Sequence, residues 1–318
     1  MNGCTVRAPA AVSVSALTPR VAIVILQWRR ADETAACLRS VAALDYANYT
    51  VLVVDNHSAD GSVDRLQRQF PTLRTVENSA NLGFAGGCNV GIEAALADPA
   101  VRYVLLLNND TRVAPDLLGE MVWAAEADPT ALVIGAVNRA GDRHTSSGGH
   151  IRWWTGRYED VFDRLPEAAV LRQPVVEVDA VAGSSMLVRA EPLRAGVLLD
   201  PDFFCVFEET DWCLRLRARG GRVLLATRAR LEHRPFTTMG RPLHLYFRFR
   251  NRPYFMARHA RPVHWITFLP YYAAEAAARI VAYTLVGRHA EARCVLLGVW
   301  DGARGRLGPG RVEQLLVA

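Results

Sequence analysis

Two short clusters of acid and amide side chains could carry chemistry in this chain. The first is Asn-Asn-Asp at 108–110, which ends an apolar run, and the second is Glu-Glu-Thr-Asp at 208–211, which follows the apolar "DPDFFCVF". A carboxylate at a strand end can hold Mg²⁺ or Mn²⁺ between two phosphates, because these cations need only one or two protein carboxylates. Crowded carboxylates raise one another's pKa, which suits a general base.

Each of these features also has a purely structural interpretation. Asn and Asp favour turns, so 108–110 could simply end a strand. Acids are ordinary in the first turn of a helix, although the apolar lead-in to 208–211 favours a cavity. Asp55, after another apolar run, could contact a nucleotide or cap a turn. His233 becomes a candidate ligand only if the fold brings it near Asp110.

Alternating apolar runs and amphipathic segments predict the elements that position these residues. Such a pattern indicates an open, mostly parallel α/β sheet, in which ligands bind beyond the carboxyl ends of the strands. Both Asp55 and the 108–110 cluster follow predicted strands and therefore fall at that edge. The predicted strands cover 21–26, 51–54, 74–76 and 103–107. The predicted helices cover 31–44 and 114–128, another ends at 70, and the segment 81–96 opens with glycines and becomes a helix.

The sequence after the first strand disfavours two classes of nucleotide enzyme. It reads "LQWRRADE", without the glycine-rich turn that a dinucleotide dehydrogenase or a sugar nucleotidyltransferase would need there. The glycines of "GFAGG" (83–87) follow the third strand and have a different spacing. The six cysteines are scattered without a CxxC pair, which predicts reduced thiols in a cytoplasmic protein.

Charge is distributed unevenly along the chain. All 37 basic side chains are arginine, and residues 212–318 hold 19 of them against 5 acidic residues. This balance predicts an anionic partner such as phosphate or a membrane surface, while the aromatic pattern disfavours nucleic acid. The apolar stretch 263–286 contains Glu275 and Arg279, so we expect an amphipathic helix rather than a membrane span. That helix could lie on a membrane, pack against a second subunit of a homodimer, or cover the sheet.

Seven segments, in order, resemble the family 2 glycosyltransferases, and the rhamnosyltransferase-like branch most of all. The resemblance covers roughly residues 20–255 and implies a GT-A fold, with a Rossmann-like, mostly parallel central sheet flanked by helices. We therefore expect a flexible tail at 1–20, without a signal-peptide core, a GT-A domain at 21–255 and an amphipathic helical extension at 256–318. The segments are "VVDNHSADGS", "NLGFAGGCNVGI", "YVLLLNNDT", "VAGSSMLVRAE", "FFCVFEETDWCLRLRARGGRV", "EHRPF" and "FRNR".

The resemblance also implies a reaction and its residues. It is an inverting, metal-dependent transfer of a sugar, rhamnose being one candidate, from a dTDP- or UDP-sugar to a glycan, lipid-linked or small-molecule hydroxyl. Glu209 would be the base, within a cluster that includes Glu208, and Asp211 is the alternative base. Asp110 and His233 would hold Mg²⁺ or Mn²⁺. The expected contacts to the nucleotide sugar are Asp55, Asn56, Asn81, Gly83, Asn108, Asn109, Asp110, Gly183, Ser184 and Arg250.

Three positions depart from the family pattern. Glu209 stands where an aspartate is usual, Asn108 replaces the first aspartate of the D-x-D motif, and Trp28-Arg29 follows the first strand. One extra methylene at Glu209 moves the carboxylate by about 1 Å, and such a shift can change a rate greatly. A non-catalytic relative that only binds the donor therefore remains an alternative. The resemblance places the protein in the cytoplasm, where it could contact the inner face of the membrane.

Overall fold

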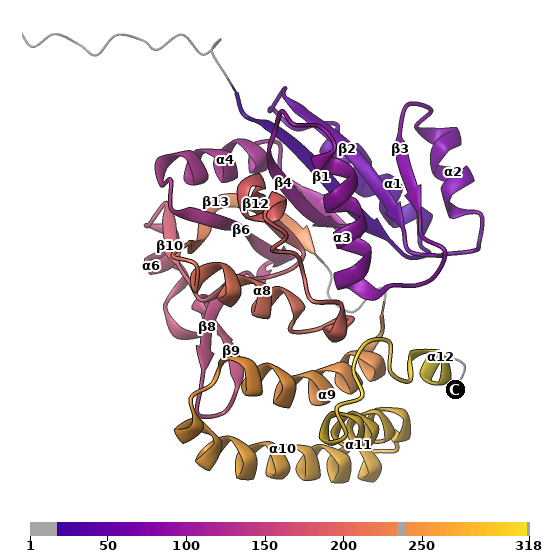
Figure 1. Cartoon of the computed structure of the whole chain (residues 1–318), viewed down its shortest axis with the longest axis vertical. Coiled ribbons are helices and arrows are strands. Elements are labelled where there is room, and N and C mark those ends of the chain that lie inside the picture. Colours follow the sequence, from indigo (N-terminus) through magenta and orange to yellow (C-terminus); the bar gives the residue numbers. More distant parts are fainter. Residues whose placement is uncertain (1–17, 234–238, 317–318) are drawn as a thin grey trace, which may run out of the picture.

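Four parallel strands form one half of the main sheet. The computed structural model describes residues 18–233 and 239–316. The four strands pair in the order β4-β1-β2-β3, and every neighbouring pair is parallel. Their carboxyl ends therefore lie at one edge of the sheet (Figure 1). These strands are β1 (Arg20–Gln27), β2 (Tyr49–Asp55), β3 (Arg74–Glu77) and β4 (Val101–Asn108).

The other half of the sheet mixes strand directions. β12 lies between β4 and β6 and is antiparallel to both, whereas β13 is parallel to β6 and antiparallel to β10 and β5. A small separate sheet has the order β11-β8-β9. The strands of this half and of the small sheet are β5 (Thr111–Val113), β6 (Ala131–Ala140), β7 (Arg143–His144), β8 (Gly148–Arg152), β9 (Arg157–Asp160), β10 (Val175–Glu177), β11 (Ala180–Val181), β12 (Ser185–Arg189) and β13 (Arg222–His233).

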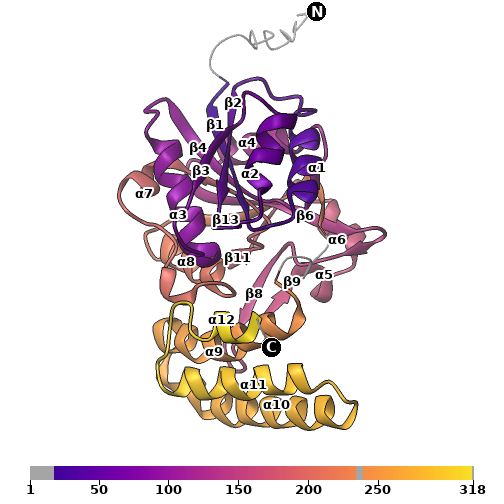
Figure 2. The same ribbon diagram turned by 90° about the vertical axis from the view of Figure 1, so that its right-hand side faces the viewer.

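Helices cover both faces of the main sheet (Figure 2). α1, α2 and α4 pack on one face, and α3, α7 and α8 pack on the other. Burial on both sides explains why β1 needs an unbroken apolar run rather than an alternating one. The helices of this domain are α1 (Ala31–Val41), α2 (Ser62–Gln69), α3 (Gly83–Leu96), α4 (Leu117–Ala127), α5 (Val161–Arg164), α6 (Glu167–Leu171), α7 (Ala190–Arg194) and α8 (Glu208–Arg217).

The expected α/β architecture is confirmed, with corrections at element ends. α1 ends at Val41 rather than at residue 44, where the chain turns. α4 begins at Leu117, so Pro115 precedes the helix instead of lying in its first turn. The predicted tail at 1–20 falls mainly on residues 1–17, which lie outside the described residues, and β1 already begins at Arg20.

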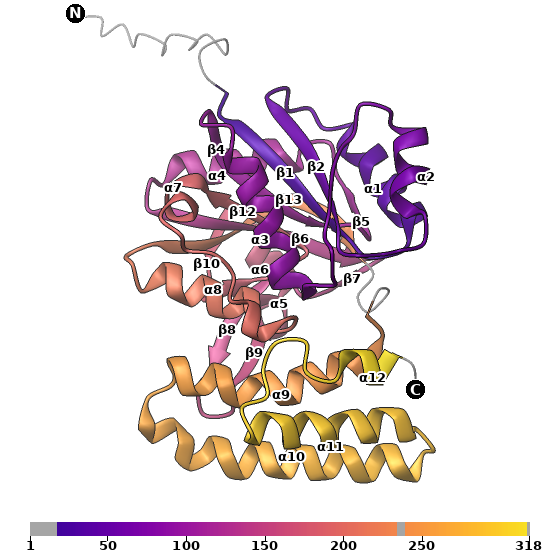
Figure 3. The ribbon, with the colours of Figure 1, turned by 45° about the vertical axis from the view of Figure 1, so that its right-hand side comes forward.

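The carboxyl-terminal helices form a layer of their own on one side of the sheet domain (Figure 3). α9 lies nearest the sheet domain and α10 lies farthest from it (Figures 1 and 3). α9 runs through the boundary expected at 255–256, so the extension begins inside a continuous helix. No helix in the described part of the chain is long and apolar enough to cross a bilayer. The helices are α9 (Arg241–His259), α10 (Trp265–Leu285), α11 (His289–Ala303) and α12 (Val312–Leu316), with short 3₁₀ turns η1 (Pro201–Phe203) and η2 (Pro262–His264).

Candidate functional site

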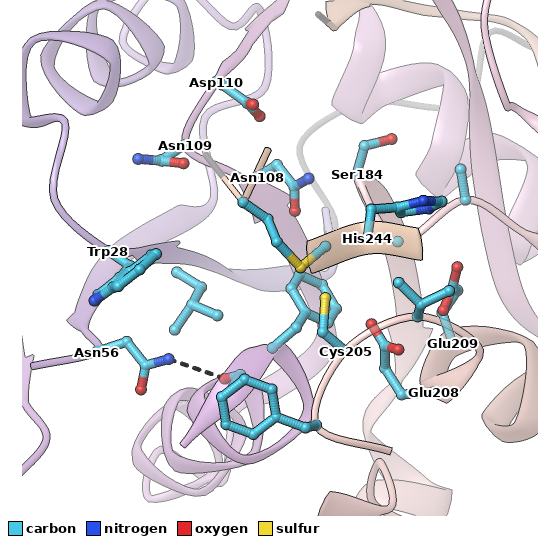
Figure 4. A pocket seen from close by; sticks show the side chains of 18 of the residues that line it. Trp28, Asn56, Asn108, Asn109, Asp110, Ser184, Cys205, Glu208, Glu209 and His244 are labelled. Atoms are coloured by element: carbon cyan, nitrogen blue, oxygen red, sulfur yellow. Dashed lines mark hydrogen bonds between the residues drawn. The ribbon is translucent and has the colours of Figure 1, made fainter. Parts of the chain in front are cut away.

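A cavity of about 380 Å³ lies between the carboxyl ends of the parallel strands and the helical layer. Eleven of the fourteen residues expected from the sequence line it: Asn56, Asn81, Gly83, Asn108, Asn109, Asp110, Gly183, Ser184, Glu208, Glu209 and His233. The remaining three, Asp55, Asp211 and Arg250, do not line it. Figure 4 shows the 108–110 cluster and the acid pair on opposite sides of this space.

Two asparagines build the turn at the start of α3. Asn56 Nδ2 donates to Asn81 Oδ1 at 2.9 Å and to the Gly83 carbonyl oxygen at 3.0 Å. The Asn56 Oδ1 atom accepts from the Leu82 amide at 3.0 Å. Gly83 has φ +70°, and a Cβ there would lie 2.4 Å from the Phe204 carbonyl oxygen. Only glycine therefore lets the α3 turn approach the loop on the opposite side of the cavity.

Asp55, the last residue of β2, is buried and does not line the cavity. Its carboxylate accepts from Gln27 Nε2 at 3.0 Å, from the Ser58 amide at 2.8 Å and from Ser58 Oγ at 2.5 Å. These contacts match the turn-capping interpretation, and a contact of Asp55 with the nucleotide stays a prediction. Ser58 Oγ in turn accepts from the Arg29 amide at 2.6 Å, beside Trp28 in the cavity wall. Asp55 thus helps to position Trp28.

The chain brings Asp110 and His233 together. β5 pairs with the end of β13, with Thr111 opposite His233, so the residue before Thr111 lies beside the histidine. Asp110 Oδ1 and His233 Nε2 are 3.3 Å apart, and both residues line the cavity. The side chain of the neighbouring Asn109 points away from this pair, and its Nδ2 donates to Thr34 Oγ1 at 2.9 Å. The condition under which His233 becomes a candidate ligand is therefore met.

This pair fits a divalent cation only if the substrate completes the site. In the described residues, no group of three or more His, Cys, Asp or Glu side chains could enclose a metal ion. Mg²⁺ and Mn²⁺, however, are often bound by one or two protein groups together with substrate phosphates. One carboxylate and one imidazole facing an open cavity form a donor set of that kind.

The acid pair opens α8 in the cavity wall, with Glu208 buried and Glu209 half-buried. Burial raises the pKa of Glu209, while backbone amides at the helix start oppose that rise. Burial and the neighbouring Glu209 raise the pKa of Glu208 still further. Among the described residues, neither Glu208 Oε2 nor Glu209 Oε2 has a hydrogen-bond partner. Glu208 therefore holds a proton more readily than Glu209, and Glu209 is the better placed of the two to act as a proton acceptor.

Asp211, the alternative base, is not placed to act on a substrate. Its carboxylate is buried, accepts from Arg215 Nε at 2.7 Å and His259 Nε2 at 2.8 Å, and forms an ion pair with Arg258 Nε at 3.1 Å. Burial alone would raise the pKa of Asp211, but these partners, led by His259, outweigh it and lower the pKa. Asp211 instead ties α8 to the last turn of α9.

Arg250, expected to meet the leaving diphosphate, is a structural clamp. Its guanidinium is fully buried and donates to the carbonyl oxygens of Gly308, Asp202 and Phe203. The adjacent Asn251 Nδ2 lies 2.7–2.9 Å from the carbonyl oxygens of Phe203, Cys205 and Val206. Most donors of the two side chains are thus directed at the loop 202–206, one reaches Gly308 before α12, and neither residue lines the cavity.

The clamped loop needs such support because its backbone is strained. Phe204, Val206 and Phe207 all have positive φ, between 62° and 79°. Residues with a Cβ rarely adopt this conformation, and a β-branched valine does so at particular cost. The loop leads directly into Glu208, so the buried Arg250-Asn251 pair fixes where the acid pair enters the cavity.

Sequence reasoning missed the part of the cavity wall that the extension supplies. Leu243 and His244 come from α9 and Val312 from α12, and Cys205 from the strained loop joins them. Burial lowers the pKa of His244 to about 4, with Arg248 and Arg241 adding to the effect, so its imidazole is neutral. The apolar "FFCVF" hinted at a cavity, but no local pattern could show that α9 and α12 close it.

Comparisons with known proteins agree with this geometry. The family model described as "Glycosyl transferase family 2" matches residues 22–193, more than half of the chain. Succinoglycan biosynthesis protein ExoO of Rhizobium meliloti is 26% identical over 174 residues, covering 54% of this chain and 44% of that protein. An N-acetylglucosaminyl-diphospho-decaprenol L-rhamnosyltransferase of Mycobacterium tuberculosis is 26% identical over 224 residues, covering 64% of this chain and 73% of that protein. The chain thus spans less than half of the first relative.

Solved structures share the fold. Mannosyltransferase PcManGT from Pyrobaculum calidifontis, solved with GDP-Man and Mn²⁺, superposes with a TM-score of 0.59 at 18% identity, covering 91% of this chain and 88% of that one. GalNAc-T7, solved with UDP, GalNAc and Mn²⁺, gives a TM-score of 0.54 at 16% identity and covers 67% of this chain and 43% of that one. Sheet topology, cavity position and the family match agree: the chain belongs to glycosyl transferase family 2, with a GT-A fold.

Proposed function

We propose that this protein transfers a sugar from a nucleotide-diphosphate sugar to an acceptor hydroxyl, with inversion at the anomeric carbon. The observation that carries the proposal is the arrangement of one cavity. The paired Asp110 and His233 line its strand-end side. The half-buried Glu209, with an oxygen that has no hydrogen-bond partner among the described residues, lines its other side. A donor diphosphate and an acceptor hydroxyl would each meet a suitable group.

Asp110 and His233 would hold Mg²⁺ or Mn²⁺ together with diphosphate oxygens. When bound, the cation supplies positive charge that neutralises the leaving diphosphate. The Mn²⁺ named for both solved neighbours supports this assignment. Because Asn108 replaces the usual aspartate, the 108–110 motif offers the metal one carboxylate, that of Asp110. The donor diphosphate would therefore have to supply further ligands to the metal.

Glu209 would act as the general base. As the oxygen of the acceptor hydroxyl bonds to the anomeric carbon, the hydroxyl proton passes to Glu209. At the same time the bond between that carbon and the diphosphate oxygen breaks. A single displacement of this kind inverts the configuration. Glu208, whose pKa burial and Glu209 raise well above the usual value, would keep its proton and so place no second negative charge beside the base.

The donor we would test first is a dTDP-rhamnose, because one relative is named as a rhamnosyltransferase. That relative's name includes a lipid diphosphate acceptor, which makes a lipid-linked glycan the first acceptor to test. UDP- and GDP-sugars and small-molecule acceptors form the comparison set. The expected place of action is the cytoplasmic side of the membrane.

A second candidate function is donor binding without transfer. Glu209, one methylene longer than the usual aspartate, is the observation that favours it. Nucleotide release from UDP-, dTDP- and GDP-sugars, measured with Mn²⁺ and with EDTA, tests the main proposal. We expect slow release from one donor, lost with EDTA, and faster release when acceptor is added. Donor binding without release, with every acceptor class supplied, would support the binding protein instead.

A further inference from the structure

The outer side of α10 is an apolar surface with no charged side chain. Its twelve exposed positions are 266, 267, 269, 270, 273, 274, 277, 278, 281, 282, 284 and 285, which hold only apolar residues and two threonines. Ile266 is 73% exposed and Leu285 is 81% exposed. These positions lie opposite the buried Phe268, Tyr272 and Ala276, so they form one face of the helix.

This face lies at the far end of the molecule, where α11 also exposes apolar side chains. Leu296 and Trp300 are also exposed, on α11, which packs beside α10. Eight of the twelve large apolar side chains exposed in the described chain fall between residues 263 and 300. α10 is the element farthest from the sheet in all three ribbon views (Figures 1–3). Such a concentration of exposed apolar surface marks an interaction site.

The charges around this face are of one sign. Residues 261–304 contain three acidic side chains, and each is turned inward and paired: Glu275 with Arg252, Glu291 with Arg288, and Asp301 with Arg311. The exposed side chains at the rim include Arg261, Arg293 and Arg304. Arg304 also lies 3.6 Å from the Trp300 ring centroid, so guanidinium and indole share one edge of the face.

We propose that the α10 face docks on an anionic lipid bilayer. An amphipathic helix with an apolar face, a basic rim and an aromatic residue at its edge binds in the plane of a membrane, with its apolar side at the boundary between headgroups and acyl chains. The arginine rim complements lipid phosphates and anionic headgroups. A second copy of the chain fits less well, because a self-paired face would place arginine rims together without exposed carboxylates to meet them.

Docking would hold the cavity one layer of helices away from the bilayer. α9 contributes Leu243 and His244 to the cavity wall and packs with α10 in one hydrophobic core, through Phe249, Phe255 and Phe268. This places the acceptor side of the cavity, rather than the donor side, toward the membrane. Only this orientation of the cavity rests on the proposed function; the docking of the α10 face does not.

The test is sedimentation of the full chain with vesicles of phosphatidylcholine, alone or mixed with phosphatidylglycerol. We expect binding to the mixed vesicles that is about tenfold weaker with phosphatidylcholine alone and weaker in high salt. Ile266→Glu with Leu285→Glu should reduce binding by about tenfold or more, because both side chains would have to carry charge into the acyl boundary. Both residues are exposed, so the thermal midpoint should not fall.

Leu165→Glu is the matched control, since Leu165 is an exposed apolar residue of the sheet domain, and it should bind like the wild type. Absence of binding to every vesicle, or binding unchanged in the double variant, would overturn the proposal. So would a wild-type dimer in sedimentation equilibrium that the double variant converts to monomers without any vesicle binding. Donor hydrolysis, followed in the same preparations, reports separately on the reaction.

Discussion

The two walls of the cavity are built in different ways. On the strand-end wall, Asn108 to Asp110 follow a parallel strand whose place is fixed by backbone pairing with β1. On the opposite wall, Glu208 and Glu209 follow a strained loop that side chains of α9 hold in place. The first wall is a property of the sheet, and the second depends on the extension. Donor binding and proton transfer should therefore respond differently to mutation.

Glu209→Gln should have the largest effect, because it removes the proton acceptor and keeps the shape of the wall. We expect turnover to fall about a thousandfold, within the range for loss of a general base. Nucleotide affinity, measured by calorimetry, should be unchanged, since the strand-end wall is intact. Glu191→Gln, at an exposed carboxylate of α7, is the control. If Glu209→Gln weakened nucleotide binding as much as turnover, the two walls would not act separately.

Asp110→Asn tests the strand-end wall. It removes the single carboxylate of the proposed metal pair, and we expect about a hundredfold lower activity with a higher Mn²⁺ requirement. Nucleotide binding in the presence of Mn²⁺ should weaken as well, which separates this variant from the one at Glu209. Asp116→Asn, at an exposed aspartate near the start of α4, should behave as the wild type. Activity that is unchanged by both EDTA and Asp110→Asn would contradict a metal requirement of the reaction.

Asn251→Ala tests the clamp. It leaves three backbone carbonyl groups of the strained loop without their shared donor, so we expect roughly tenfold slower turnover with nucleotide affinity kept. The free energy of unfolding should fall by about 2–3 kcal/mol. Asn89→Ala also removes a side chain that holds a loop, at Leu199, but away from the cavity. The Asn89→Ala control should lose stability but keep its turnover. Equal turnover in the two variants would refute a positioning role for Asn251.

Glu208→Gln should have the smallest effect and should depend on pH. The raised pKa of Glu208 favours the protonated form in the folded protein, so its contribution to stability is present at low pH and is lost as pH rises. The Gln side chain of the variant is neutral at every pH and does not lose this stability. The melting temperature of the variant should therefore be roughly 2–4 °C higher than that of the wild type at alkaline pH. The difference should vanish below about pH 4, near the ordinary pKa of glutamate. A difference in melting temperature that stays constant with pH would mean that the pKa of Glu208 is not raised in the folded protein.

The strand-end wall was predictable from the sequence because its causes are local. An apolar run followed by polar residues gives both the strand β4 and the position of Asp110 at the ligand-binding edge. The acid pair was found for a similar reason, from charges placed after an apolar segment. Family resemblance then supplied the roles, and the family match and fold are confirmed.

The remaining features depend on contacts that are distant in the sequence. His233 meets Asp110 through the pairing of β5 with β13, which no periodicity predicts. Arg250 and Asp211 were assigned to the site from charge and motif, but both are buried among protein partners that lie on other elements. Val312 reaches the cavity only because the extension folds back over it. Side-chain partners, unlike strand ends, leave little trace in a local pattern.

The most direct test of the central claim is the anomeric configuration of the transferred or released sugar, read by proton NMR in the first minutes of reaction with the donor that the nucleotide-release assay selects. A single displacement with Glu209 as base predicts inversion relative to the donor, and almost no product from Glu209→Gln. A product that retains the donor configuration, or one formed equally well by Glu209→Gln, would contradict the account.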